Sequence, residues 1–168
     1  MLNLERIVVG VSAALLGFFV TNQDVTAQDG ATITVWQVAK DVYRFGAGGG
    51  DSGYYSMFVV TDDGVIAIEP VSVKHAEGLL AAIRTVTEQP VRYLLHSHNH
   101  WDHSKGGAVF RAEGAKIVAH VEAYEWMRAN PHPDMALPDD VWAGNRRDIS
   151  LGGKTIELHY LGMNHGLG

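Results

Sequence analysis

Alternating apolar and polar residues at the start of the chain predict antiparallel β structure. Apolar runs at 33–38 and 42–45 are separated by a short polar turn, and runs at 54–61 and 65–68 flank Asp62-Asp63-Gly64. An Asp-Gly pair favours a tight hairpin, because glycine accepts the positive φ that the turn requires. We therefore expect a meander of short strands before the first helix.

The apolar period changes at Val73 from that of a strand to that of a helix. Apolar residues recur at helical spacing up to Val86, Ser72 is a candidate N-cap, and Gln89-Pro90 ends the run. Strand and helix then alternate, and we expect a strand at 91–95, a helix near 108–112, a strand at 116–119 and a helix at 121–129.

The last part of the chain is predicted to be a loop followed by a hairpin. Residues 130–140 contain three prolines, which favours a stiff surface loop. Alternating runs at 147–151 and 154–161, around Gly152-Gly153, predict two paired strands. Together these elements predict an α/β sandwich, one domain over 28–168 with helices covering sheet faces.

An uncharged apolar run of 14 residues, 7–20, precedes this domain. The run is short for a membrane-spanning helix, which needs about 20 residues. The small residues of Val25-Thr26-Ala27 fit a signal peptidase site, so we expect a signal peptide over 1–27 and an exported protein, periplasmic or secreted. An uncleaved anchor or a buried helix is the alternative. Once the signal is removed, no stable membrane span is expected.

Composition narrows the chemistry. The 168 residues include 13 Lys and Arg against 19 Asp and Glu, and the net charge of −6 has the wrong sign for holding a phosphate backbone. We therefore expect no nucleic-acid partner. The absence of cysteine excludes disulfides, thiolate nucleophiles and cysteine-containing metal sites. Any metal must be held by nitrogen and oxygen, and the chain offers nine histidines.

Several of these histidines stand together just after a predicted strand. His98, His100, Asp102 and His103 form the pattern H-x-H-x-D-H. Imidazole nitrogen and carboxylate oxygen are the zinc ligands that remain when thiolate is missing. In an extended turn, His98 and His100 can point to the same side and converge on one ion. Asp102 and His103 then turn toward a neighbouring position, which is typical of two-metal sites. His96 is interpreted as a structural group or as one that supports the ligands.

The segment HNHWDH from His98 to His103, with Gly106-Gly107 behind it and a hairpin meander before it, resembles the metallo-β-lactamase superfamily of metallohydrolases. The resemblance implies the αββα sandwich of that family. It also implies two metal positions, the first held by His98, His100 and His165 and the second by Asp102 and His103.

Two departures from the family pattern are visible. The family commonly has an aspartate after the hairpin where this chain has Glu69, which leaves that supporting role open. The family also continues into a second β/α half that supplies a bridging acid and a further histidine, whereas this chain ends three residues after His165. We therefore expect the first half of the fold, with the C-terminal half and the remaining second-site ligands missing.

The activity that the resemblance implies is metal-dependent hydrolysis of a small-molecule substrate. A zinc-bound hydroxide would attack an ester, thioester, lactam or related bond, and Asp102 would orient it and accept its proton. One or two metal ions are expected. Zinc is favoured over iron, because His100 stands where the di-iron relatives carry glutamate. Two alternatives stay open: a metal-binding but catalytically incomplete fragment, and a mononuclear iron oxidative enzyme of the same fold. The sequence decides neither the substrate nor the oligomeric state.

Other residues give weaker signals. Gly50-Asp51-Ser52-Gly53 matches the nucleophile region of trypsin-like proteases, but residues 28–50 hold no histidine, so it is interpreted as a turn. His120 is expected to cap or pack at a helix start, while His75 and His159 are expected on polar faces. The candidate apolar walls of a substrate pocket are Trp101, Trp126, Met127 and Trp142, with core packing favoured for Trp126 and Met127.

Overall fold

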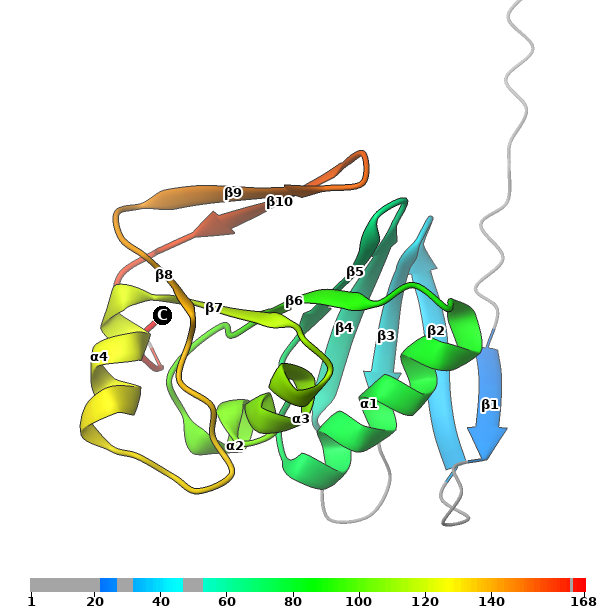
Figure 1. Ribbon diagram of the computed structural model, residues 1–168, viewed down its shortest axis with the longest axis horizontal. Coiled ribbons are helices and arrows are strands. Elements are labelled where there is room, and N and C mark those ends of the chain that lie inside the picture. The colour runs from blue at the N-terminus through cyan, green and yellow to red at the C-terminus, as the bar shows by residue number, and fades with distance from the viewer. Residues whose placement is uncertain (1–21, 27–31, 47–52, 164) are drawn as a thin grey trace, which may run out of the picture.

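The computed structural model describes residues 22–26, 32–46, 53–163 and 165–168 (Figure 1). Its strands are β1 (Asn22–Thr26), β2 (Thr32–Ala39), β3 (Val42–Gly46), β4 (Tyr55–Thr61), β5 (Gly64–Ile68), β6 (Val91–Leu95), β7 (Lys116–His120), β8 (Asp140–Trp142), β9 (Arg146–Leu151) and β10 (Lys154–His159). Its helices are α1 (Val73–Val86), α2 (Trp101–Ser104), α3 (Gly107–Ala112) and α4 (Val121–Ala129). The predicted meander, the alternating segment and the last hairpin are therefore all present.

The strands form one large sheet and one separate hairpin. The large sheet keeps β1 to β8 in chain order, and β9 pairs with β10 in a two-stranded sheet. Pairs from β1 to β5 are antiparallel, whereas β5, β6, β7 and β8 run parallel to one another. Figure 1 shows the helices on one side of the large sheet and the β9–β10 hairpin on the other. The switch to parallel pairing at β5 brings the ends of β5 and β6 to the same edge.

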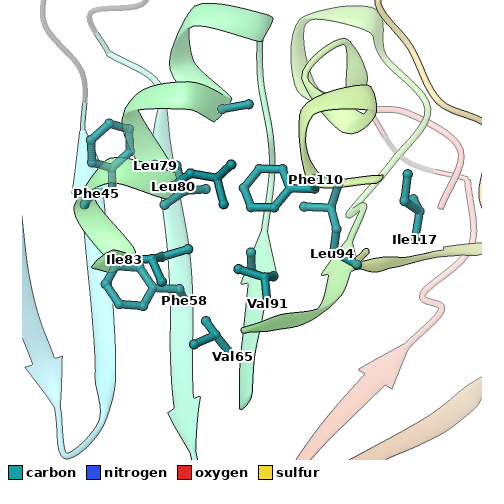
Figure 2. Close-up of a cluster of buried hydrophobic side chains, with 14 of the residues drawn as sticks. Phe45, Phe58, Val65, Leu79, Leu80, Ile83, Val91, Leu94, Phe110 and Ile117 are labelled. Carbon is teal, nitrogen blue, oxygen red and sulfur yellow. The ribbon is translucent and has the colours of Figure 1, made fainter. Parts of the chain in front are cut away.

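The larger core lies between α1, α3 and the sheet. Ser72 caps α1, since its hydroxyl accepts a hydrogen bond from the backbone N–H of His75 at 3.1 Å. Leu79 and Ile83 of α1 are buried against the sheet, where Figure 2 shows Ile83 beside Phe58. Burying each such side chain contributes about 1.5–3 kcal/mol. This core holds α1, and the turn that precedes it, against the sheet.

A smaller core lies on the other face of the sheet. Ile66, Leu95 and Val118 of the sheet pack there with Ile149 of β9. Trp142, a candidate pocket wall from the sequence, is only 9% exposed and belongs to this core, because β8 carries it under the hairpin. The hairpin therefore covers the sheet face that the helices leave open.

The prediction that His75 lies on a polar face of its helix is wrong. His75 is fully buried, with Nε2 2.8 Å from Ser56 Oγ and its ring edge-on to Phe45 at 4.9 Å between centroids. His75 stands four residues before Leu79, so helical spacing turns it toward the sheet despite its polarity, and the buried Ser56 hydroxyl on β4 makes a polar side chain acceptable there.

A second correction concerns the loop predicted over 130–140. Its last residue, Asp140, begins β8, which pairs with β7 in parallel. The backbone N–H of Asp139 donates to Ile117 O at 2.9 Å, and that of Ile117 donates to the Asp139 carboxylate at 3.1 Å. These contacts join segments far apart in the sequence, so no local pattern predicts the strand.

The predicted signal peptide, 1–27, lies outside the described residues except for Asn22–Thr26, which forms β1 beside β2. Residues 47–52, which include most of the Gly50-Asp51-Ser52-Gly53 turn, also lie outside them. Within the described ranges, the helices are too short or too polar to cross a membrane.

Candidate metal centre

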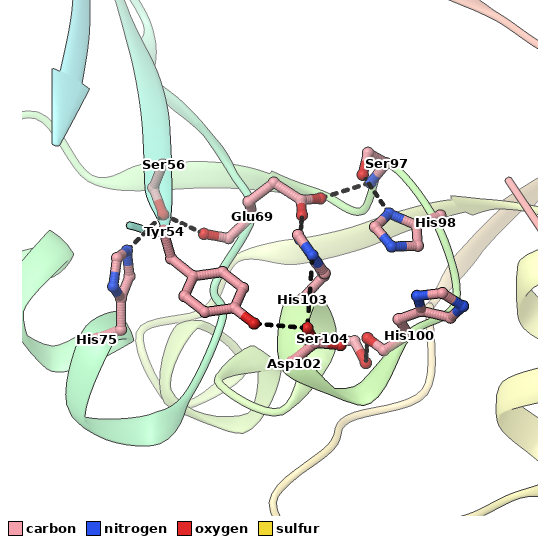
Figure 3. Close-up of polar contacts among 10 residues, drawn as sticks. All are labelled: Tyr54, Ser56, Glu69, His75, Ser97, His98, His100, Asp102, His103 and Ser104. Atoms are coloured by element: carbon pink, nitrogen blue, oxygen red, sulfur yellow. Dashed lines mark hydrogen bonds and ion pairs between the residues drawn. The ribbon is translucent and has the colours of Figure 1, made fainter. Parts of the chain in front are cut away.

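The predicted ligands gather where two parallel strands end. Glu69 directly follows β5, and the histidine loop from His96 to His100 directly follows β6. The backbone then turns into α2, for which His100 is the N-cap residue. The carboxyl ends of parallel strands are where open α/β sheets place their ligands. Figure 3 shows the side chains of this edge converging from β4, the turn after β5 and the histidine loop.

Three imidazoles form the first group. His98, His100 and His165 each offer a ligand atom, and these atoms all lie within 4.8 Å of one another. The ring centroids of His98 and His100 are 4.7 Å apart, and those of His100 and His165 are 4.8 Å apart. The structure therefore brings the histidine that lies far along the chain to the two histidines of the loop.

One nitrogen of this group lacks a partner. His98 Nδ1 lies 2.8 Å from Ser97 Oγ, while His98 Nε2 is buried and has no hydrogen-bond partner in the described part of the chain. Burial and the neighbouring His103 lower the pKa of His98, which favours the neutral imidazole that a metal requires. A buried nitrogen without a partner costs free energy, and coordination would satisfy it. The donor set therefore fits a metal ion such as zinc.

The C-terminal segment that carries His165 is fixed against the loop. The backbone N–H of Leu167 donates to Asn99 Oδ1 at 2.6 Å, and Asn99 is only 3% exposed. A Cβ at Gly166 would lie 2.6 Å from His98 Cδ2, so the absence of a side chain there permits the approach. The sequence motif draws attention to the ligands and misses Asn99, which has no pattern of its own.

Asp102 and His103 lie side by side but make different contacts. The two side chains face each other, with His103 Nε2 3.8 Å from Asp102 Oδ2. The hydroxyl of Tyr54 donates a hydrogen bond to Asp102 Oδ2 at 2.8 Å. Burial raises the pKa of Asp102, but the Tyr54 hydrogen bond and nearby histidines outweigh it, and the pKa is lowered. Asp102 is therefore an ionised, half-exposed carboxylate beside His103.

Glu69 resolves the role that the sequence leaves open. Its Oε2 lies 2.5 Å from His103 Nδ1, and its Oε1 accepts a hydrogen bond from the backbone N–H of Ser97 at 2.7 Å. Burial raises the pKa of Glu69, but these hydrogen bonds outweigh it and hold the pKa below its ordinary value. Ligand atoms of Glu69, His98 and His103 form a second compact group. Because both Glu69 oxygens are already engaged, we interpret the carboxylate as orienting His103 and leaving its Nε2 free.

The turn that carries Glu69 is strained. Glu69 has φ 65° and Val71 has φ 57°, values that residues other than glycine rarely adopt. Ser56 Oγ donates to the backbone oxygen of Glu69, and the backbone N–H of Val71 donates to His103 O at 3.3 Å. A Cβ at Gly106 would lie 2.5 Å from the backbone oxygen of Pro70, which explains why a glycine follows the motif. The surrounding contacts thus hold a conformation that costs free energy.

The part of the chain that matches a known family includes every residue of this centre. Residues 49–168 match the model of the metallo-beta-lactamase superfamily. The chain belongs to this superfamily. The resemblance inferred from the motif is therefore confirmed, and so is the α/β fold that it implies.

Individual relatives agree with this membership. The chain is 31% identical over 137 residues to the alpha subunit of a 2,4-dinitroanisole O-demethylase from Nocardioides sp. (strain JS1661), covering 80% of this chain and 38% of that protein. A metallo-beta-lactamase from Pontibacter korlensis superimposes with a TM-score of 0.65 at 20% identity, over 76% of this chain and 60% of that one. Metallo-beta-lactamase MIM-1 from Novosphingobium pentaromativorans gives a TM-score of 0.56 at 27% identity, over 67% of this chain and 45% of that one. The chain thus spans between about two fifths and three fifths of these relatives.

The other histidines do not join the two ligand groups found in the described residues. His96 is 8% exposed, burial lowers its pKa to about 4, and neither ring nitrogen has a hydrogen-bond partner there. His120 caps α4 by accepting from the backbone N–H of Glu122 at 3.4 Å, as the sequence predicts. His159 is exposed on β10. The superfamily motif therefore separates ligand candidates from structural histidines better than burial does.

Two aromatic residues lie near the loop without entering it. Trp101 is 43% exposed, and its ring centroid lies 5.7 Å from that of Trp126. Its indole N–H donates to the backbone oxygen of Asn130 at 3.2 Å. Met127 is fully buried, which confirms the core packing favoured for it. Trp101 thus ties α2 to the end of α4.

Proposed function

We propose that this chain carries the metal centre of a hydrolase that cleaves an ester, thioester, lactam or related bond in a small molecule. His98, His100 and His165 would hold one zinc ion, and Asp102 and His103 would contribute to a second. Membership in a superfamily of metal-dependent hydrolases with some oxygenase members supports an enzyme of this general kind. Export, which the apolar run at 7–20 suggests, and a small-molecule substrate, which membership in the superfamily suggests, are part of the same proposal.

The observation that supports the proposal most directly is the close approach of three imidazoles, one of which carries a buried nitrogen without a partner in the described residues. Ligand atoms of His98, His100 and His165 lie within 4.8 Å of one another, and His98 Nε2 has no hydrogen-bond partner among the described residues. Three histidines leave a position open for substrate or water, which distinguishes a catalytic zinc site from a closed structural one. The chemistry that the metal supplies when bound is Lewis acidity, which makes hydroxide available near neutral pH.

The side chains around the ligands have separate tasks in this proposal. Asp102 is ionised and 54% exposed, so its carboxylate can orient the nucleophile by accepting a hydrogen bond from it. Glu69 is nearly buried and accepts from Ser97 and His103, so it orients a ligand and does not reach the substrate. Two carboxylates in one site thus differ in role because they differ in exposure.

A second candidate function is cleavage of an aryl methyl ether. The relative from Nocardioides that is 31% identical over 80% of this chain is named as a subunit of an O-demethylase that acts on 2,4-dinitroanisole. Removal of a methyl group from oxygen can be hydrolytic or oxidative, and an iron centre would suit the oxidative route. The metal that the protein selects therefore separates the hydrolytic from the oxidative route, while the substrate that it turns over separates the two candidate functions.

The test begins with metal analysis of the 168-residue chain, purified without added zinc. Zinc-dependent hydrolysis of a p-nitrophenyl ester or a chromogenic lactam would support the proposal. The His165→Ala variant should lose both first-site metal and turnover. His159→Ala is the matched control, because His159 stands six residues earlier on β10 and pairs with Glu157 at the surface.

The outcomes are distinct. Retained zinc and turnover in His165→Ala would overturn the ligand assignment. Demethylation of an aryl methyl ether without ester or lactam hydrolysis would favour the second candidate, by the hydrolytic route if the protein holds zinc and by the oxidative route if it holds iron. Zinc bound without turnover on any of the substrates would favour a metal-binding chain that is catalytically incomplete by itself.

A further inference from the structure

Tyr54 reaches the ligand loop from a distant part of the chain. It stands directly before β4, 48 residues before Asp102, and its hydroxyl donates to Asp102 Oδ2 at 2.8 Å. Its ring lies edge-on to the ring of His103, with 5.5 Å between centroids and 65° between planes. Figure 3 shows the tyrosine between the Glu69 turn and α2, with its hydroxyl directed at the Asp102 carboxylate. One side chain therefore contacts both residues of the second metal position.

Asp102 needs such a contact more than the other candidate ligands do. Its side chain is 54% exposed and belongs to α2, a helix of only four residues. His103, by comparison, is 27% exposed and its Nδ1 is tied to Glu69. An exposed aspartate on a short helix can adopt several rotamers, and a hydrogen bond to one oxygen selects among them. The carboxylate then keeps its second oxygen for a metal.

The neighbouring tyrosine shows that this contact depends on position. Successive side chains of a strand point to opposite faces, so Tyr55 is directed away from the centre. Tyr55 is 52% exposed, and its ring packs near Trp36 and under the guanidinium of Arg44. Two adjacent tyrosines with the same side chain thus make different contacts, and only Tyr54 contacts Asp102 and His103.

We propose that Tyr54 is a positioning residue for the second metal position, where its hydroxyl orients Asp102 and its ring packs against His103. This role rests on the proposed function, because it requires that Asp102 and His103 hold a metal. Contacts of this kind, one step removed from the ion, typically change metal affinity by about 10–100-fold when they are lost. Tyr54→Phe removes the hydroxyl and keeps the ring, so it isolates the hydrogen bond from the packing.

The test is a Co²⁺ titration of the 168-residue chain, monitored by calorimetry and by the visible absorption of bound Co²⁺. In Tyr54→Phe we expect the first equivalent to bind as in the wild type. The second should bind about tenfold more weakly or worse, with an altered absorption spectrum. Tyr55→Phe is the matched control, and both equivalents should bind to it normally. An unchanged first equivalent also shows that the variant is folded.

Three outcomes would overturn the role of Tyr54. Wild-type affinity and absorption for the second equivalent in Tyr54→Phe would show that the hydroxyl does not position Asp102. Loss of both equivalents would assign Tyr54 to the fold as a whole. A wild-type protein that binds a single equivalent would remove the second metal position and this role together, while a one-metal hydrolase centred on His98, His100 and His165 would still stand.

Discussion

Two clusters of polar side chains differ in whether their own atoms satisfy one another. In the ion-pair cluster, which joins β7, β8 and β9, Asp140 accepts from Arg147 Nη1 and Nη2 at 2.6 and 2.7 Å. Lys116 Nζ lies 3.0 Å from the same carboxylate. Hydrogen bonding to Arg147, opposed by burial and reinforced by Lys116, lowers the pKa of Asp140 to about 2. This cluster is complete without any added group.

The metal centre, by contrast, contains polar atoms that its own side chains do not satisfy. His98 Nε2 is buried with no hydrogen-bond partner in the described ranges, and Glu69 and Val71 adopt positive φ. Unsatisfied polar atoms and backbone strain both lower stability, and they concentrate where a ligand or a reaction makes use of them. The comparison teaches that polarity alone does not mark a functional site. What marks the metal centre is an unsatisfied buried nitrogen together with further ligand atoms within 4.8 Å, a combination that His96 lacks among the described residues.

The largest expected effect that tests this comparison is loss of the first metal in His98→Ala. Zinc at 100 times the Kd of the first position should stabilise the wild-type protein by about 2.7 kcal/mol through that position, and the variant should lose this contribution. Without metal, the free energy of unfolding should change by no more than roughly 1 kcal/mol, because the replacement also removes an unsatisfied nitrogen. Thermal unfolding with and without zinc measures both quantities. A zinc-dependent gain in the variant as large as that of the wild type would contradict the assignment.

The two clusters also differ in how far the sequence predicts them. His98, His100, Asp102 and His103 lie within six residues, so a local pattern places them together and a family resemblance adds His165. The contacts that support them cross the sheet. Tyr54 and Glu69 meet the histidine loop only because β5 pairs in parallel with β6. Local patterns predict most elements of the fold, but no local pattern records such a pairing.

The ion-pair cluster illustrates the same limit more strongly. Asp140 lies in a segment that three prolines mark as a loop, and its strand exists only beside β7. The burial of His75 likewise depends on Ser56, which lies 19 residues away. What the sequence fails to predict here is therefore tertiary pairing, and secondary-structure propensity would not reveal it.

The next largest effect concerns Glu69, which has hydrogen-bond partners for both oxygens, as Asp140 does, but belongs to the metal centre. Glu69→Gln leaves one acceptor oxygen for two donors, the Ser97 backbone and His103 Nδ1, so the orientation of His103 should loosen. We expect the affinity for a second metal equivalent to fall by about 10–100-fold. Calorimetric titration with zinc checks this, with Glu113→Gln, an exposed partner of Arg84, as the control. A loss of stability with unchanged metal affinity would show that Glu69 supports the fold and does not orient a metal ligand.

The ion-pair cluster should respond in the opposite way. Asp140→Asn removes a carboxylate that is 16% exposed and leaves Arg147 without its charged acceptor. The free energy of unfolding should fall by about 1–3 kcal/mol, while metal affinity stays unchanged. Urea unfolding and zinc titration of the same variant measure the two effects. Asp148→Asn, which breaks an exposed pair with Arg146, should cost only about 0–1 kcal/mol.

The smallest effect is the pH dependence of that same carboxylate. The pKa of Asp140 is about 2 in the folded protein and 3.8 in the reference state. Because the folded pKa is the lower one, ionised Asp140 stabilises the fold fully above pH 3.8, and this stabilisation is lost as the pH falls through about 2. The stability difference between the wild type and Asp140→Asn should therefore be constant from about pH 5 to pH 7 and should narrow below about pH 4.

Urea unfolding of both proteins across this range checks the sign of the effect. A difference that narrows already near neutral pH would mean that a group with a higher pKa, such as a histidine, controls the stability of this region. The claim that the ion-pair cluster stabilises the fold through its own charges would then be wrong. A difference that persists to about pH 4 would show that the cluster works through Asp140 ionisation alone, with no contribution from the histidines of the metal centre.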